Sequence, residues 1–388
     1  MYNKQMVALG EKRSAIRELA EYGKTLAEKI GQENVFDFTI GNPSVPTPNA
    51  VNKAIASLVL NDEKVHGYTS AQGILSVRQK IARQNTKNGV TIDAEHVYLT
   101  CGASAALAIC MRAVVTEEQN EIVLLAPYFP EYTVFAENAQ GKTIVVPADE
   151  KNFQIDFDAL QASLTPKTAA VVVNSPNNPS GVVYSAETLK KLADVLTSAE
   201  KRFGTVIVLI SDEPYREIVF DAPFESPLQY YADSALCYSF SKSFSLAGER
   251  IGYVALPNGL KNVDEFFSAV LGAGRSLGYV CAPSLFQKTV ELCLSESANV
   301  SPYKANRDLL VASLRKMGFC VVNPQGAFYV LVKSPDEDFA DKAKKLGILF
   351  VPTDSFGLPG YVRVATCVSE DMIKRSLSAW EKLAKATL

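Results

Sequence analysis

The feature that most constrains the fold is an alternation of short apolar runs with longer stretches of helical character between about residues 45 and 290. The runs 169–173 and 205–210 are rich in β-branched residues and are typical of buried strands. Similar runs lie at 96–100, 122–126, 143–146, 235–240 and 251–256. Strands that alternate with helices favour a mostly parallel sheet with crossover helices. The sequence therefore predicts an α/β fold.

The remaining strand-like runs lie near the carboxyl end of the chain, at 319–322, 328–332, 349–351 and 362–365. With 388 residues and 47% hydrophobic content, the chain is too long for one ordinary core. We therefore expect a large domain from 45 to 290 and a smaller α/β domain formed by 1–44 and 291–388. Ser185 and Ser369 are expected to cap helices, and 11–30 has the apolar spacing of an amphipathic helix.

Polar residues follow two of the predicted strands. Asn178 lies in a turn-rich loop after the run 169–173, and Asp212 and Tyr215 follow the run 205–210. Ligands of open α/β sheets collect outside the carboxyl ends of the strands, so these side chains can converge there. By itself, each has a common structural role as a cap, a turn former or a core residue.

A lysine beside hydroxyl and guanidinium groups adds a second signal. Ser239, Ser241, Lys242 and Arg250 lie within one short segment. A lysine amine can form a Schiff base with an aldehyde, and pyridoxal phosphate supplies both this aldehyde and a dianionic phosphate. The segment offers groups for both ends of that molecule.

The motifs, in this order and spacing, resemble the class I/II aminotransferases of the fold-type I pyridoxal-phosphate enzymes, which include aspartate aminotransferase. The resemblance spans nearly the whole chain and implies a seven-stranded sheet in the large domain. It rests on Gly41-Asn42-Pro43, Tyr68, Thr100-Cys101-Gly102-Ala103-Ser104, Pro127-Tyr128-Phe129-Pro130, Asn178-Pro179-x-Gly181, Asp212-x-x-Tyr215, Ser239-x-Ser241-Lys242, Arg250 and Tyr361-Val362-Arg363.

The resemblance assigns catalytic roles around pyridoxal 5′-phosphate. Lys242 would hold the cofactor and later move the α-proton of the substrate. Asp212 would pair with the protonated pyridine nitrogen, and Tyr215 and Asn178 would bind the phenolic oxygen of the ring. Phe129 would lie against the ring face, at a position where tryptophan is often found.

The phosphate group is the next element that the resemblance places. It would be bound at the start of a helix and by nearby side chains. The residues of the helix start are Gly102, Ala103 and Ser104, and the nearby residues are Ser239, Ser241 and Arg250. Tyr68 would reach this site from a partner subunit, which implies a homodimer.

Substrate binding is assigned mainly to Arg363, whose guanidinium would bind the α-carboxylate of amino acids and 2-oxo acids, with Gly41 and Asn178 beside it. Arg275 lies where dicarboxylate-specific relatives place an arginine at the subunit interface, which favours aspartate and glutamate. Ser104 argues against this specificity, because some bacterial aspartate aminotransferases have a lysine there. Aromatic or aliphatic amino acids, and a C–S β-lyase reaction on cysteine conjugates, remain alternatives.

Composition excludes several other classes. A net charge of −3 without basic runs gives no footprint for nucleic acid or an anionic membrane. The seven cysteines and two histidines lack the spacing of a metal site or a disulfide framework. The start of the chain lacks the apolar stretch of a signal peptide, and no run is long enough to span a membrane, so we expect a cytoplasmic protein. A regulator built on this fold would need a DNA-binding segment, for which 1–45 is too short.

Overall fold

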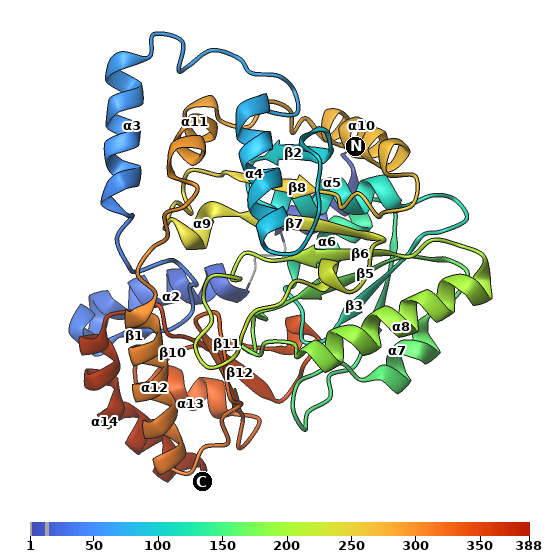
Figure 1. Cartoon of the computed structure of the whole chain (residues 1–388). Helices are drawn as coiled ribbons and strands as arrows, with labels where there is room; N and C mark the ends of the chain where they lie inside the picture. Colours follow the sequence, from blue (N-terminus) through green and yellow to red (C-terminus); the bar gives the residue numbers. More distant parts are fainter. Residues whose placement is uncertain (1, 12–14) are drawn as a thin grey trace.

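The computed structural model describes residues 2–11 and 15–388. Its largest feature is a seven-stranded sheet in the order β2-β8-β7-β6-β5-β3-β4 (Figure 1). Of these strands, β8 runs in the opposite direction to the other six. The predicted mostly parallel sheet of an α/β fold is thus confirmed. The strands are β2 (Val97–Thr100), β3 (Glu121–Leu125), β4 (Lys142–Val146), β5 (Thr168–Asn174), β6 (Val208–Asp212), β7 (Ser234–Ser239) and β8 (Gly252–Ala255).

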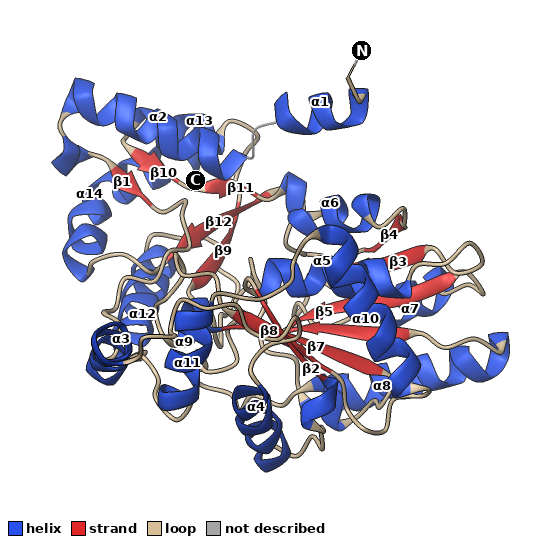
Figure 2. Ribbon diagram, turned by 90° about the horizontal axis from the view of Figure 1, so that it is seen from above, coloured by secondary structure: helices blue, strands red, loops and turns tan. Residues whose placement is uncertain are grey.

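Helices cover both faces of this sheet (Figure 2). Successive residues of a strand point to opposite faces, so in β3 the side chains of Ile122 and Leu124 join one core cluster and those of Val123 and Leu125 another. The first cluster lies under α5 (Ala103–Val114), α6 (Glu131–Asn138) and α10 (Val263–Leu277), and the second under α7 (Phe157–Ser163) and α8 (Ala186–Phe203). A third cluster includes residues of α3 (Asn49–Asn61), α4 (Leu75–Lys87) and α11 (Ser284–Cys293).

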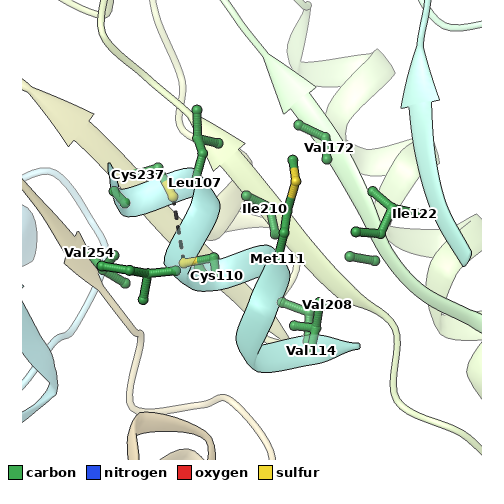
Figure 3. Packing of buried hydrophobic residues seen from close by; sticks show 14 of the residues in the cluster. Leu107, Cys110, Met111, Val114, Ile122, Val172, Val208, Ile210, Cys237 and Val254 are labelled. Atoms are coloured by element: carbon green, nitrogen blue, oxygen red, sulfur yellow. Dashed lines mark hydrogen bonds between the residues drawn. The ribbon is translucent and has the colours of Figure 1, made fainter. Parts of the chain in front are cut away.

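The helix α5 shows how closely the first core is packed. Leu107, Cys110, Met111 and Val114 point from α5 toward the sheet, and the sulfur of Cys110 lies 3.7 Å from that of Cys237 on β7 (Figure 3). The same helix begins at the carboxyl ends of the strands, so this packing holds its first turn against the sheet.

Both ends of the chain contribute to a second, smaller layer. The antiparallel sheet β11-β12-β9 comprises Val351–Pro352, Tyr361–Ala365 and Tyr329–Lys333, and β1 (Phe36–Asp37) pairs with β10 (Ile348–Leu349) in parallel. Around these strands lie α12 (Ser301–Lys316), α13 (Phe339–Lys345) and α14 (Glu370–Thr387) (Figure 1). The division into a large domain of 45–290 and a smaller domain of 1–44 and 291–388 stays a prediction.

Several local predictions can be compared with the structure. The hydroxyls of Ser185 and Ser369 cap α8 and α14, as expected. The run 319–322 forms one isolated bridge, Val321 with Val332, instead of a strand. The pairing stops soon after it, where Pro324 has no backbone N–H to donate.

The amino-terminal segment holds two helices, α1 (Lys4–Glu11) and α2 (Ala15–Ile30). Positions 12–14 of the predicted helix over 11–30 lie outside the described residues. Leu19 of α2 is buried against Val351 and Phe356 of the smaller layer. None of the helices within the described ranges has the length and apolar character of a membrane span.

Candidate active site

A cavity of about 280 Å³ lies at the carboxyl ends of the central strands. Most of the residues singled out from the sequence line it, although they come from distant parts of the chain. They are Gly41, Ala103, Ser104, Phe129, Asn178, Asp212, Tyr215, Ser239, Ser241, Lys242, Arg250 and Arg363. The sheet thus brings together the groups that the motifs predicted at strand ends.

Lys242 occupies the short helix α9 (Phe240–Ser243), directly after β7. The side chain of Ser239 caps this helix by accepting a hydrogen bond from the backbone N–H of Ser241. The Nζ atom of Lys242 donates to the carbonyl oxygen of Gly41 at 2.7 Å. Burial, with added repulsion from Arg363 and Arg250, lowers the pKa of Lys242 to about 8. Such an amine is neutral more often than an ordinary lysine, which suits a nucleophile or a base.

Asp212 is the last residue of β6 and is buried. Its Oδ2 atom accepts a hydrogen bond from the hydroxyl of Tyr132, whereas its Oδ1 atom has no partner among the described residues. Burial, reinforced by the neighbouring Glu213, raises the pKa of Asp212 to about 7. Because buried polar atoms are almost always paired, the free Oδ1 atom fits a protonated nitrogen of a bound ring.

The first turn of α5 forms one wall of the cavity. Gly102 caps this helix with a φ of +84°, and a Cβ atom at this position would lie 2.8 Å from Nη2 of Arg250. Glycine therefore allows the guanidinium to approach the helix start, whose N–H groups lack partners within the helix. This combination of unpaired N–H groups and positive charge favours an anion.

Two serines extend this anion site. The Oγ atom of Ser241 lies 2.7 Å from that of Ser239 and 3.4 Å from Nη1 of Arg250. Hydroxyls that already contact one another and a guanidinium can turn to donate to phosphate oxygens. The arrangement has the donor set that a phosphate monoester requires.

Arg363 projects from β12 and is only 2% exposed. Its Nη1 atom donates to Oδ1 of Asn178 at 3.0 Å, and its Nη2 atom donates to the carbonyl oxygen of Thr39 at 2.6 Å. The Nε atom is buried without a partner in the part of the chain that the structure describes. A fixed guanidinium with a free donor is suited to a carboxylate ligand.

Two aromatic side chains complete the ring-binding part of the cavity. Phe129 is half-buried and meets Tyr132 edge-on, with ring centroids 5.7 Å apart. Tyr215 is buried, and its hydroxyl lies 3.1 Å from that of Tyr329. Burial raises the pKa of Tyr215 well above its ordinary value, so its phenol remains protonated and can donate.

Three predicted residues do not line the cavity, and one of them, Gly102, caps α5 directly before Ala103, which does. Tyr68 is fully exposed, and Arg275 is exposed in the last turn of α10. Both were predicted to act across a subunit interface, which a single chain does not test.

The sequence analysis missed Tyr132, Tyr329 and Asn174. Asn174 ends β5 and joins two predicted residues, because its side chain binds the backbone oxygen of Asp212 and the backbone N–H of Asn178. Its place at the end of an apolar run was a usable signal. The two tyrosines had none, because a tyrosine within an apolar segment is typical of any core.

Comparisons with known proteins find similar proteins along most of the chain. Residues 33–379 match the family model described as aminotransferase class I and II. A probable aspartate aminotransferase of Methanocaldococcus jannaschii is 30% identical over 94% of this chain and 96% of its own length. A probable N-acetyl-LL-diaminopimelate aminotransferase of Bacillus subtilis is 30% identical over 90% of this chain and 89% of its own length. The crystal structure of an amino transferase from Eubacterium rectale superposes with a TM-score of 0.97 at 49% identity, covering 100% of this chain and 99% of that one.

Proposed function

Because the chain belongs to the class I and II aminotransferases, we propose that it uses pyridoxal 5′-phosphate to move an amino group between an L-amino acid and a 2-oxo acid in two half-reactions. The observation that carries this proposal is the presence of the Lys242 amine and the unpaired Oδ1 atom of Asp212 in one cavity. A covalent anchor and a partner for a ring nitrogen are the two groups that this cofactor requires most.

The residues of the cavity fit the cofactor from both ends. Gly102, Ser239, Ser241 and Arg250 form the anion site at the start of α5. Asp212 would hold its negative charge against the ring nitrogen, and Phe129 would cover one ring face. When bound, the cofactor supplies a ring that accepts electrons from a carbon that loses its proton.

The chain itself supplies binding and proton transfer. Arg363 would orient the substrate through its α-carboxylate, with Asn178 holding the guanidinium in place. Lys242 would then move the proton at the substrate Cα atom, because its pKa of about 8 leaves a useful neutral fraction near neutral pH. The cavity lies between the large sheet and the smaller layer, so closure of the two around a substrate would exclude water.

We further propose aspartate or glutamate as the amino donor. The support is the position of Arg275 in the sequence and the name of the M. jannaschii relative, whereas the B. subtilis relative is named for another substrate at the same identity. The described basic residues that line the cavity are Lys242, Arg250 and Arg363, and each already has a role. A second substrate carboxylate would therefore need Arg275 from outside this cavity.

The assembly follows from the same proposal. The chain would act as a homodimer in the cytoplasm, and Tyr68 would complete the phosphate site of the other subunit. The full exposure of Tyr68 in the single chain supports this arrangement.

The activity is tested by adding single amino acids to the purified holoprotein and following its absorbance. Transamination converts the bound cofactor to its amine form without a second substrate, so the absorbance of the starting form must fall. Release of pyruvate and ammonia from cysteine conjugates, with no such conversion by any amino acid, would instead support the lyase alternative.

The substrate is tested with Arg275→Leu. We expect this change to raise KM for aspartate far more than KM for phenylalanine. An equal effect on both substrates, or conversion of only aromatic or aliphatic amino acids by the unchanged protein, would overturn the dicarboxylate proposal.

A further inference from the structure

Tyr329 lies at the centre of the proposed substrate site, although no motif pointed to it. It is the first residue of β9, it is 3% exposed, and it lines the cavity. A Cβ atom at position 41 would collide with its hydroxyl, so only glycine there lets the backbone pass so close. The same Gly41 accepts the hydrogen bond from Lys242. Tyr329 is therefore packed against the residue that holds the amine.

The ring of Tyr329 supports Arg363. The guanidinium carbon lies 4.5 Å from the centroid of the Tyr329 ring, and 5.3 Å from that of Phe356. Such contacts are attractive because the face of an aromatic ring is electron-rich. Since Nη1 and Nη2 of Arg363 are bound to Asn178 and Thr39, the ring contact adds a third constraint on the guanidinium.

The hydroxyl of Tyr329 faces another predicted site residue, the hydroxyl of Tyr215, at 3.1 Å. Burial raises the pKa of both phenols, so both keep their protons near neutral pH. In a pair of hydroxyls one donates and the other accepts. If Tyr329 donates, the hydrogen of Tyr215 is left to donate into the cavity.

We propose that Tyr329 is a positioning residue that acts on both sides of the site. Its ring fixes Arg363 for the substrate carboxylate, and its hydroxyl donates to Tyr215 so that Tyr215 donates to the phenolic oxygen of the cofactor. The inference rests on the proposed function. It adds a residue that links the carboxylate-binding arginine to the ring-binding phenol.

Two variants separate the two parts of the proposal. Tyr329→Phe keeps the ring and removes the hydroxyl, whereas Tyr329→Leu removes both. Tyr231→Phe is a control, because Tyr231 is also buried and its hydroxyl also donates a hydrogen bond, to the backbone oxygen of Ile207 at 2.8 Å. Tyr231 packs in the core beside α8 and does not line the cavity.

The first readout is the pH at which the absorbance of the bound cofactor changes. A hydrogen donated by Tyr215 stabilises negative charge on the phenolic oxygen, and this favours loss of the cofactor's proton. Tyr329→Phe should weaken that donor and raise the midpoint by about 0.5 to 1 pH unit. The other titratable or charged groups facing the two phenols are Asp212, Tyr132, Arg363, Cys367 and Lys242, whose Nζ atom lies 6.0 Å from the centroid of the Tyr215 ring. The variant leaves all five in place.

The second readout is the split between KM and kcat. KM is measured for the amino acid that the unchanged enzyme converts best. We expect this KM to stay within about twofold of the unchanged value in Tyr329→Phe, and to rise about threefold to thirtyfold in Tyr329→Leu. Urea unfolding of all variants shows whether Tyr329→Leu is folded, and Tyr329→Phe tests the hydroxyl in either case.

An unchanged pH midpoint in Tyr329→Phe, or the same shift in Tyr231→Phe, overturns the hydroxyl part. An unchanged KM in a folded Tyr329→Leu overturns the ring part. Both outcomes can be told apart from failure of the proposed function. If that function is wrong, no amino acid alters the absorbance of the unchanged holoprotein.

Discussion

The side-chain oxygen of Asn178 accepts a 3.0 Å hydrogen bond from the guanidinium of Arg363, although 185 positions separate the two residues. Asn178 follows β5 of the large sheet, whereas Arg363 belongs to β12 of the small one. The bond therefore connects the two layers across the cavity. It fixes the arginine before any substrate carboxylate arrives, which reduces the entropy lost on binding.

Replacing Arg363 by lysine is expected to lower kcat/KM by about 10- to 100-fold, mainly through KM. Lysine keeps the charge but cannot reproduce the planar set of donors that Arg363 directs at Asn178 and Thr39. Arg202→Lys is the control, because Arg202 is exposed in the last turn of α8. Steady-state kinetics of both variants provide the measurement. A wild-type KM in Arg363→Lys would remove this residue from substrate binding.

Gly102→Ala should weaken the binding of pyridoxal phosphate by about tenfold or more. The backbone of Gly102 has a φ of +84° and a ψ of 175°, a region that almost only glycine occupies, so a side chain there is strained by about 1–3 kcal/mol, and the new Cβ atom would press on Arg250. Gly204→Ala is a control for a positive φ without a contact, because Gly204 is in the left-handed region, with a φ of +71° and a ψ of 22°, and its added Cβ atom meets nothing within 4 Å. Both variants should lose stability in urea. If their affinities for the cofactor are also equal, the contact with Arg250 has no part in phosphate binding.

The sequence predicted the parts of this site that depend on local patterns. An apolar run followed by polar residues is a local signal, so the sequence alone was enough to place Asp212 and Asn178 at strand ends. Tyr329 could not be found in this way. Its position beside Arg363 depends on the pairing of β9 with β12, in which Leu331 is opposite Arg363 and Tyr329 opposite Ala365. Such long-range register is not readable from a single strand.

The predicted roles of two surface residues stay untested for a different reason. Tyr68 and Arg275 are exposed in the isolated chain, and their predicted roles require a second copy of the molecule. A test of these roles needs the burial of both side chains in an assembly of two chains, so they stay predictions.

Lys242→Ala is expected to abolish turnover, with a loss of at least about 100- to 10,000-fold in kcat, because the variant has no amine to move the α-proton. Borohydride reduction followed by mass spectrometry adds a readout that is independent of turnover. It should fix pyridoxal phosphate to the unchanged protein on the peptide that contains Lys242, and leave the variant unlabelled. Labelling of the variant at another lysine would contradict the assignment.

Asp212 should make the cofactor-free protein less stable as pH rises from about 4 to 7. Burial raises its pKa to about 7 in the folded protein, compared with about 3.9 in an unfolded chain. Between these values the folded state holds a proton that the unfolded state has released. The free energy of unfolding contributed by this group therefore falls by about 1.4 kcal/mol per pH unit.

Asp212→Asn removes this titration, so its stability relative to the unchanged protein should increase between pH 5 and 7 in urea unfolding without cofactor. Asp194→Asn, an exposed change on α8, should show no such trend. Saturating pyridoxal phosphate should abolish this trend, because a positive charge beside the unpaired Oδ1 atom favours the ionised carboxylate, which then holds no proton in either the folded or the unfolded state above about pH 5. If the difference between Asp212→Asn and the unchanged protein is constant across this pH range, Asp212 is already ionised in the empty site, and burial does not raise its pKa there.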